Sequence, residues 1–222
     1  MINKKKFKNL IFDLDGTLIN SGEGIKNALF ESFLKVKFKM SLQKNQIKIG
    51  PPLSETIKEC NDNLSDFDVD AIKNYFIDIY DNELFKELDI FPNVDILLDR
   101  LSTFNLKIYI GTNKRYIPTM KILEYLSWTK FFVNIYSIDK YVYKFNDKAQ
   151  MLNKLLVEEK LHAEETLYIG DRYSDFIASN KNKISFIGAN WGESDFIDFE
   201  TEFQIIDKLD SQTINYLVSL FS

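Results

Sequence analysis

The stretch NLIFDLDGTLIN, residues 9–20, places Asp13 and Asp15 one residue apart at the end of a short apolar run, with Gly16 directly behind them. Aspartate and glycine after a strand are ordinary turn residues, so the stretch alone predicts only a turn. Residues i and i+2 of a strand point to the same side, however, and both carboxylates can therefore reach one crevice where the strand ends. Gly16 allows the chain to turn away sharply at that point.

Two carboxylates this close together need a cation if both are to remain ionised, and a hard cation such as Mg²⁺ prefers oxygen ligands. The arrangement also separates the roles of the two groups, because one can act as an ionised nucleophile while the other holds a proton. The stretch therefore indicates chemistry at Asp13 and Asp15 if further polar groups converge on the same place.

The composition excludes several classes of protein. With 222 residues, 45% hydrophobic and 27% charged, the chain has the composition of a folded globular protein. A net charge of −5 gives no large basic field, so we expect no nucleic-acid partner. Cys60 is the single cysteine and His162 the single histidine, which excludes an intramolecular disulfide, thiolate and histidine zinc sites and Ser-His-Asp triads. No apolar run has membrane-spanning length and no signal peptide is present, so we expect a cytoplasmic protein without a membrane partner, as a monomer or weak homodimer.

Four short apolar runs each end in a polar or glycine-containing turn, and helical patterns lie between them. Strands that alternate with helices predict an α/β fold, in which a parallel sheet is covered on both faces. Ligands of such sheets bind beyond the carboxyl ends of the strands, so we expect all four turns at one crevice. The runs are FKNLIFDLDG (7–16), LKIYIGTNK (106–114), TLYIGDRYSD (166–175) and ISFIGANWG (184–192), and the helical patterns begin at residues 94, 117, 148 and 175.

Residues 20–90 break this alternation. Apolar residues recur there at helical spacing, for example at Ile72, Phe76 and Ile79. Pro92 marks the return to the alternating pattern. The expected domains are therefore a helical insertion, residues 20–90, and a core made of residues 1–19 and 91–222.

The third turn, GDRYSD, adds two more carboxylates. Asp171 ends the strand and Asp175, four residues later, opens the following helix, so one face carries both. Four acids that converge on one crevice repel one another unless a metal ion or a cationic side chain offsets their charge. We therefore expect a cation close to Asp13, Asp15, Asp171 and Asp175.

The second turn, IGTN, offers groups that suit an anion. Thr112 supplies a hydroxyl, and Asn113 lies at the approach to a helix, where backbone N–H groups favour a phosphate. A lysine is expected from the segment around the helix start at 148, where Lys144 and Lys148 are both candidates. Lys148 is favoured because it lies in the first helical turn, where a positive charge indicates a nearby anionic partner.

The motifs FDLDGTL, IGTN, a lysine and GDRYSD, in this order, resemble those of the haloacid dehalogenase superfamily of phosphohydrolases, and the match spans nearly the whole chain. The resemblance implies a Rossmann-like core with a helical cap inserted directly after the first motif. It implies Asp13 as the nucleophile and Asp15 as the general acid and base. It further implies Mg²⁺ held by Asp13, the Asp15 carbonyl and Asp171 with Asp175 in support, and phosphate bound by Asp13, Gly16, Thr112, Asn113 and a lysine.

A finer resemblance, carried by GEGIKNALFESF, IGPPLSETI and KAQML, is to phosphoglycolate phosphatases and related nucleotidase-like enzymes. Pro52, Leu53 and Thr56 are then candidate substrate contacts in the cap, although a helix that starts after a proline turn explains the same residues. The chain departs from the family pattern at Asn20, where relatives often carry aspartate, and neither candidate lysine is followed by the common proline.

The expected function is that of a Mg²⁺-dependent phosphatase that hydrolyses a small phosphorylated metabolite through an aspartyl-phosphate. One alternative is a phosphomutase, which uses the same aspartyl-phosphate but returns the phosphoryl group to a sugar. Another is a phospho-accepting signalling domain. Asp15 argues against that alternative, because a built-in acid and base shortens the lifetime of the phospho-aspartate. A catalytically inactive binding protein would not need all of these polar groups.

Overall fold

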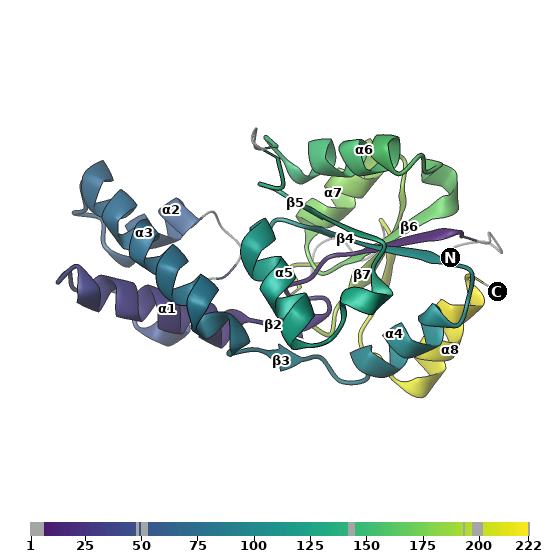
Figure 1. Cartoon of the computed structure of the whole chain (residues 1–222), viewed down its shortest axis with the longest axis horizontal. Helices are drawn as coiled ribbons and strands as arrows, with labels where there is room; N and C mark the ends of the chain where they lie inside the picture. Colours follow the sequence, from purple (N-terminus) through teal and green to yellow (C-terminus); the bar gives the residue numbers. More distant parts are fainter. Residues whose placement is uncertain are drawn as a thin grey trace. The chain divides into compact units, whose positions relative to one another are not determined.

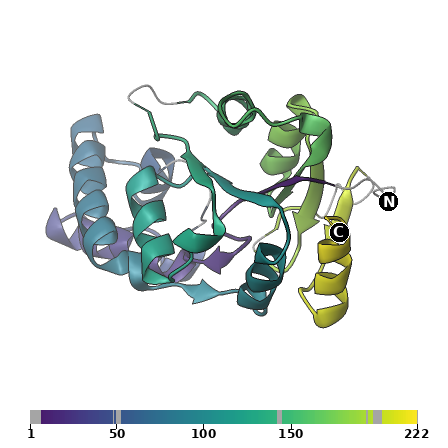
Figure 2. The same ribbon diagram turned by 45° about the vertical axis from the view of Figure 1, so that its right-hand side comes forward.

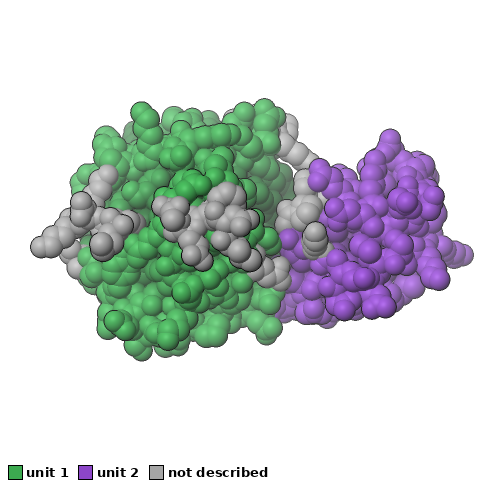
Figure 3. All heavy atoms as spheres, turned by 180° about the vertical axis from the view of Figure 1, so that it is seen from behind, with its two compact units in different colours: residues 1–20, 89–222 green, residues 21–88 purple. Residues whose placement is uncertain are grey.

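The computed structural model describes residues 7–47, 49, 53–141, 145–192, 194–196 and 202–221. The chain divides into two compact units (Figure 3). Unit 1 comprises Met1–Asn20 and Asp89–Ser222, and unit 2 comprises Ser21–Leu88.

Unit 1 contains a six-stranded sheet in the order β5-β4-β1-β6-β7-β8, in which each neighbouring pair is parallel. Every residue of the central strands β1 and β6 is buried, which explains why the sequence shows continuous apolar runs there rather than an alternating pattern. The predicted α/β fold is confirmed. The strands are β1 Asn9–Phe12, β4 Lys107–Thr112, β5 Asn134–Ser137, β6 Thr166–Gly170, β7 Ser185–Ala189 and β8 Gln204–Ile206.

Helices cover both faces of this sheet (Figures 1 and 2). Two helices that follow β5 and β6 lie on one face, and the helices before and after β4 lie on the other together with the C-terminal helix. This division follows from right-handed crossovers, because the chain moves outward in one direction from β1 to β5 and then in the other from β6 to β8. The helices are α4 Val94–Ser102, α5 Tyr116–Tyr125, α6 Lys148–Glu158, α7 Tyr173–Lys181 and α8 Ser211–Ser219, with single turns at η3 Thr129–Phe131 and η4 Ala163–Glu165.

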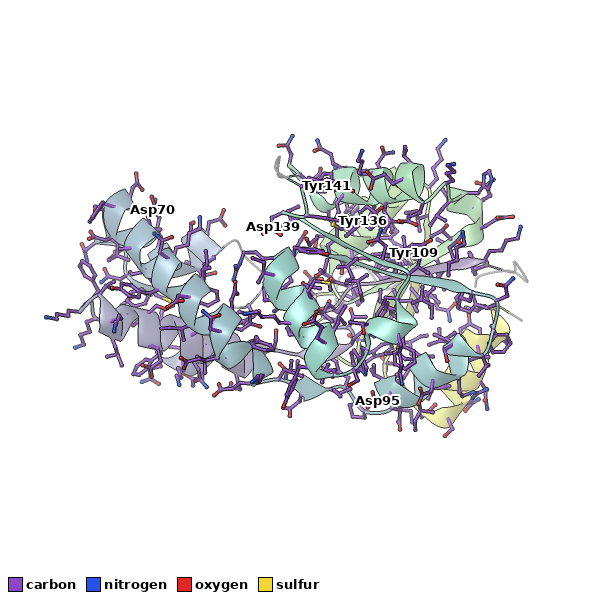
Figure 4. All side chains as sticks on the ribbon, in the orientation of Figure 1. Asp70, Asp95, Tyr109, Tyr136, Asp139 and Tyr141 are labelled. Carbon is purple, nitrogen blue, oxygen red and sulfur yellow. The ribbon has the colours of Figure 1, made fainter. Side chains whose placement is uncertain are left out.

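The C-terminal end of α6 is fixed by two tyrosines from neighbouring strands (Figure 4). The Tyr136 hydroxyl lies 2.9 Å from Glu158 Oε2 and 3.0 Å from Glu159 Oε1. Tyr109 donates to Glu159 at 3.3 Å. Both tyrosines are fully buried. The helix is therefore anchored at the end opposite to its first residue, Lys148.

A short ribbon joins the two segments of unit 1 between which unit 2 is inserted. It consists of β2 Ile19–Asn20 and β3 Asp89–Ile90, which pair antiparallel. Ile19 lies opposite Ile90, and Asn20 lies opposite Asp89. The expected insertion limits, residues 20 and 90, lie within this ribbon, whereas the compact unit itself begins at Ser21 and ends at Leu88.

All the regular secondary structure in the described residues of unit 2 is helical, and turns or irregular segments connect the helices. Its core is formed by apolar side chains at helical spacing, among them Leu29, Phe33, Ile57, Ile72 and Phe76. None of the described helices of either unit has the length and apolar character needed to cross a membrane. The elements of unit 2 are α1 Gly22–Lys35, η1 Lys44–Gln46, α2 Leu53–Cys60, α3 Asp66–Asn82 and η2 Leu84–Lys86.

Candidate active site

The register of the parallel sheet brings all four predicted turns to one edge, because β7, which precedes the fourth turn, pairs in register with β6. Phe12 lies opposite Ile110 on β4 and Ile169 on β6, so the first, second and third motifs leave the sheet at the same level. The Asp13 amide still continues this ladder and donates to the Ile169 carbonyl at 2.9 Å. Thr112, the last residue of β4, is 1% exposed and lies on the strand next to Asp13.

Three of the four predicted acids form a buried group. The carboxylates of Asp13, Asp171 and Asp175 each offer an oxygen within 4.8 Å of the others. Their exposed fractions are 6%, 1% and 0% in that order. Buried carboxylates that are this close need a positive charge, and Lys148 provides one.

Lys148 occupies the first position of α6, where the preceding Asp147 caps the helix by accepting from Gln150 N at 2.8 Å. Its ammonium lies 3.0 Å from Asp13 Oδ2 and 2.5 Å from Asp175 Oδ1. It also lies 3.2 Å from the hydroxyl of Tyr168.

Tyr168 completes the surroundings of this ammonium. Its hydroxyl donates to the Gly111 carbonyl at 2.8 Å and therefore has a lone pair free to accept from Lys148. The three protons of the Lys148 ammonium thus have three acceptors. A charge buried at 6% exposure is stabilised only by such full pairing.

Burial dominates the proton affinity of two of these acids. It raises the pKa of Asp13 to about 6, although the adjacent Lys148 ammonium lowers that pKa in part. It also raises the pKa of Asp171 to about 8, and the charge of Asp13 adds to the rise. Burial opposes the charge on Lys148 as well, but Asp13 and Asp175 outweigh it and raise the pKa of the ammonium. The group therefore favours a further cation.

One oxygen of the group has no protein partner. Among the described residues, Asp13 Oδ1 is the buried side-chain oxygen or nitrogen atom without a hydrogen bond. Buried polar atoms are almost always satisfied, so this oxygen has room for a partner such as a water molecule or a metal ion. Carboxylate oxygens are the ligands that Mg²⁺ prefers, so the donor set of Asp13 and Asp171 fits this ion.

Asp171 is held against the turn that follows β1. Its Oδ1 accepts from Thr17 Oγ1 at 3.3 Å, and its Oδ2 lies 3.4 Å from Arg172 Nε. Gly16 adopts a φ of +80°, and a Cβ atom there would lie 2.1 Å from Asp171 Oδ2. Glycine is therefore required at position 16 both by the backbone conformation and by the close approach of this carboxylate.

Asp175 is fixed by the start of α7. Its Oδ2 accepts from the Arg172 amide at 3.2 Å while its Oδ1 accepts from Lys148. A Cβ atom at Gly170 would lie 2.4 Å from Asp175 Oδ2, so this glycine makes room for the carboxylate. Both oxygens of Asp175 are thus engaged by protein donors, unlike those of Asp13.

Asp15 differs from the other three acids, because its side chain is 26% exposed and pairs with a different lysine. Lys114 Nζ lies 3.1 Å from both carboxylate oxygens of Asp15. The Lys114 amide also donates to Thr112 Oγ1 at 3.2 Å. Sequence reasoning missed Lys114, although it follows Asn113 directly in the second motif.

The remaining predicted site residues do not belong to the buried group of acids and Lys148. Asn113 is exposed at the end of the second motif, and Asn20 belongs to β2. Leu53 is half-buried and Thr56 is 5% exposed, both on α2 of unit 2. Lys144 and Pro52 lie outside the described residues.

Comparisons with known proteins agree with this architecture. Residues 10–189 match the family model of haloacid dehalogenase-like hydrolases. A 5′-nucleotidase of Pseudomonas aeruginosa is 26% identical over 197 residues, which cover 84% of this chain and 84% of that protein. A phosphoglycolate phosphatase of Psychrobacter arcticus is 27% identical over 194 residues, which cover 82% of this chain and 83% of that protein.

A solved structure shares the fold. The haloacid dehalogenase-like family hydrolase of Streptococcus pneumoniae superposes with a TM-score of 0.80 at 24% identity, covering 95% of this chain and 98% of that one. The family match includes all three motifs, because it runs from the first residues of β1 to the end of β7. This chain is therefore a hydrolase and belongs to the haloacid dehalogenase-like hydrolase family.

Proposed function

We propose that this enzyme is a Mg²⁺-dependent phosphatase that hydrolyses the phosphomonoester of a small metabolite through an aspartyl-phosphate on Asp13. The observation that carries the proposal is the buried group of Asp13, Asp171, Asp175 and Lys148. Such a group is unfavourable for folding on its own, because buried like charges repel and lose their hydration. It becomes useful where a cation and a phosphoryl group bind together.

Asp13 is suited to act as the nucleophile. Lys148 holds Oδ2 at 3.0 Å and so orients the carboxylate, while Oδ1 has no protein donor. Attack by this carboxylate on phosphorus forms an oxygen–phosphorus bond and breaks the bond to the leaving oxygen. The product is an aspartyl-phosphate and an alcohol.

Asp15 is suited to move the proton. In the first step it gives a proton to the leaving oxygen, and in the second it takes one from the water that attacks the aspartyl-phosphate. Its side chain is more exposed than that of Asp13 and therefore has access to both the alcohol and the water.

The metal would be held by Asp13, the carbonyl of Asp15 and Asp171. Asp175 would support the site by orienting Lys148 and the Arg172 amide rather than by binding the ion itself. Bound Mg²⁺ supplies positive charge that offsets the phosphoryl oxygens during transfer.

Phosphate binding is proposed for Thr112, Lys148 and the backbone N–H groups around Gly16 and Asn113. The Thr112 hydroxyl is buried at the carboxyl end of β4, where parallel sheets bind their ligands. Lys148 is favoured over Lys144 as the phosphate lysine, because its ammonium contacts the proposed nucleophile directly. The N–H that points to Asp13 Oδ2 would be shared with a bound phosphoryl oxygen.

A small phosphorylated metabolite in the cytoplasm is the proposed substrate class. Two relatives support this class, because the names 5′-nucleotidase and phosphoglycolate phosphatase each refer to a small phosphorylated compound. Unit 2 is proposed to act as the cap that selects the leaving group, with Leu53 and Thr56 as candidate contacts.

The test is a screen of phosphate esters with and without Mg²⁺, using the wild type and two variants. Asp13→Asn should be inactive, because an amide is neither a nucleophile nor an anionic ligand. Asp15→Asn should lose about 10²- to 10⁴-fold in kcat/KM on an ester with a poor leaving group. Turnover by Asp13→Asn close to that of the wild type, or wild-type activity that is independent of Mg²⁺, would contradict the proposal.

A further inference from the structure

We infer that Trp191 is a positioning residue that holds the turn bearing Asp15 in place for proton transfer, an inference that rests on the proposed function. The Trp191 indole Nε1 donates to the Thr17 carbonyl at 2.8 Å, across 174 positions of sequence. Thr17 lies two residues after Asp15 in the same turn and is fully buried.

Several backbone groups of the turn form hydrogen bonds with one another, but the Thr17 carbonyl accepts its bond from Trp191 instead. The Leu14 carbonyl accepts from the amides of Thr17, Leu18 and Ile19 at 3.3, 2.9 and 3.1 Å. The Gly16 amide donates to the Ile19 carbonyl at 2.8 Å. These bonds close the turn on itself, whereas the bond from Trp191 ties it to the loop after β7.

Gly192 brings the same loop against the same turn. A Cβ atom at Gly192 would lie 1.8 Å from the Gly16 carbonyl oxygen and 2.7 Å from its carbon. Because real Cβ atoms do not approach so closely, only glycine fits there without movement of the turn. Two consecutive residues, Trp191 and Gly192, therefore contact two consecutive residues of the turn, Gly16 and Thr17.

The loop is itself well anchored, so it can act as a support. Ala189 pairs with Ile206 at the end of β7, and the Asn190 amide donates to the Ile206 carbonyl at 2.8 Å. The Asn190 side chain donates to Asp207 Oδ1 at 2.7 Å. Trp191 thus projects from a segment that is bonded to the edge strand.

The consequence for catalysis is geometric. The Asp15 side chain is held by Lys114 from the loop after β4, and its backbone is held through Thr17 from the loop after β7. A displacement of about 1 Å in a catalytic group can cost about 10²-fold in rate. Loss of the indole N–H should therefore impair the step in which Asp15 gives its proton to the leaving oxygen.

The experiment compares two esters in Trp191→Phe, which keeps an aromatic ring and removes the N–H. The measured quantity is kcat/KM, because it covers phosphoryl transfer to Asp13 and excludes the later hydrolysis. For an alkyl phosphate, whose leaving oxygen needs a proton, we expect a loss of about 10-fold or more. For 4-nitrophenyl phosphate, whose leaving group departs as a stable anion, the loss should be several times smaller.

Trp128→Phe is the matched control. Its indole N–H donates to Asp95 Oδ1 on α4 at 2.9 Å, a similar bond within unit 1 (Figure 4 labels Asp95). This variant should keep the wild-type ratio of kcat/KM for the two esters.

The sequence has two tryptophans, so benzothienylalanine incorporated in the Trp128→Phe background replaces Trp191 alone. Benzothienylalanine keeps the shape of the indole and removes its N–H. The same two esters are compared with this protein if Trp191→Phe does not fold.

Each outcome decides the inference. A larger loss on the alkyl ester, absent in Trp128→Phe, supports it. Equal losses on both esters indicate a merely structural role and overturn it, as does unchanged kcat/KM on both. A wild type that hydrolyses neither these two nor any other ester of the screen in Mg²⁺ overturns the proposed function and this inference together.

Discussion

Lys148 Nζ lies 3.0 Å from Asp13 Oδ2, although the two residues are 135 positions apart in the sequence. The same ammonium lies 2.5 Å from Asp175 Oδ1, so one positive charge serves two buried carboxylates. This arrangement matters for folding as well as for catalysis. A buried charged group that loses its partner is not solvated by water in its place.

Lys148→Met should therefore destabilise the protein. Removing one partner of a buried ion pair typically costs about 3–5 kcal/mol, since the other charge stays buried and uncompensated. Urea unfolding in the absence of Mg²⁺ measures the change. Lys208→Met is the control, because Lys208 pairs with Asp210 on the surface and is 79% exposed, so its loss should change stability little.

A second substitution separates charge from packing. In the Lys148→Met background, Asp175→Asn removes one of the two stranded carboxylates, so the double variant should be more stable than the sum of the single effects. Additive effects would show that the methionine disturbs packing rather than charge balance.

Lys114→Met should impair catalysis without this loss of stability. Lys114 holds both oxygens of Asp15 at 3.1 Å, and its removal frees the carboxylate to rotate. We expect kcat to fall about 10-fold or more on a poor leaving group, with KM little changed, because orientation of the acid is lost rather than substrate binding. Lys107→Met, at the opposite and exposed end of β4, is the matched control. A rise in KM at constant kcat would instead assign Lys114 to substrate binding.

The raised pKa values of Asp13 and Asp171 predict how stability depends on pH. A carboxyl group whose pKa is higher in the folded state contributes stability below its unfolded pKa, and this contribution is lost as the pH rises through the folded value. Burial raises the pKa of Asp171 from 3.8 to about 8. Without Mg²⁺, the wild type should therefore lose stability relative to Asp171→Asn as the pH rises from about 4 to about 8.

Urea unfolding of both proteins in a chelator, at several pH values across this range, tests the prediction. Added Mg²⁺ should then stabilise the wild type more at the upper end of the range than at the lower, because metal and protons compete for the same oxygens. Asp171→Asn should show a much smaller response. Parallel stability curves for the two proteins would show that Asp171 ionises in the folded protein as it does in the unfolded chain.

The sheet could be predicted from sequence because its central strands are buried on both faces. β1, β4, β6 and β7 each give a continuous apolar run that ends in a turn. β5 was missed, because this edge strand is short and carries polar residues at both ends, Asn134 and Ser137. Once the strands are parallel and adjacent, their carboxyl ends must meet, which is why the acids of different motifs could be expected in one place.

The contacts of Lys114 and Trp191 could not be predicted in the same way. A lysine after a strand usually lies in solvent, and nothing local indicates that Lys114 is 6% exposed against Asp15. The bond from Trp191 to Thr17 depends on how two loops distant in sequence pack together. The positions of the acids at the strand ends are fixed by the register of the backbone. The contacts of Lys114 and Trp191 depend on how side chains pack, and this packing leaves no periodic pattern in the sequence.

The last prediction concerns unit 2, residues 21–88, as a removable cap. Asn20 and Asp89 lie opposite each other in the β2–β3 ribbon, so a two-residue Asn-Gly turn can close the chain in place of the insertion. The resulting unit 1 keeps the sheet and the residues Asp13, Asp171 and Lys148. It should therefore fold and slowly hydrolyse small activated esters, with little preference among metabolites, because nothing then excludes water or selects the leaving group. Circular dichroism checks the fold, and an Asp13→Asn version of the shortened chain is the blank for the activity assay. If the shortened chain keeps the rate and selectivity of the wild type, unit 2 has no cap role.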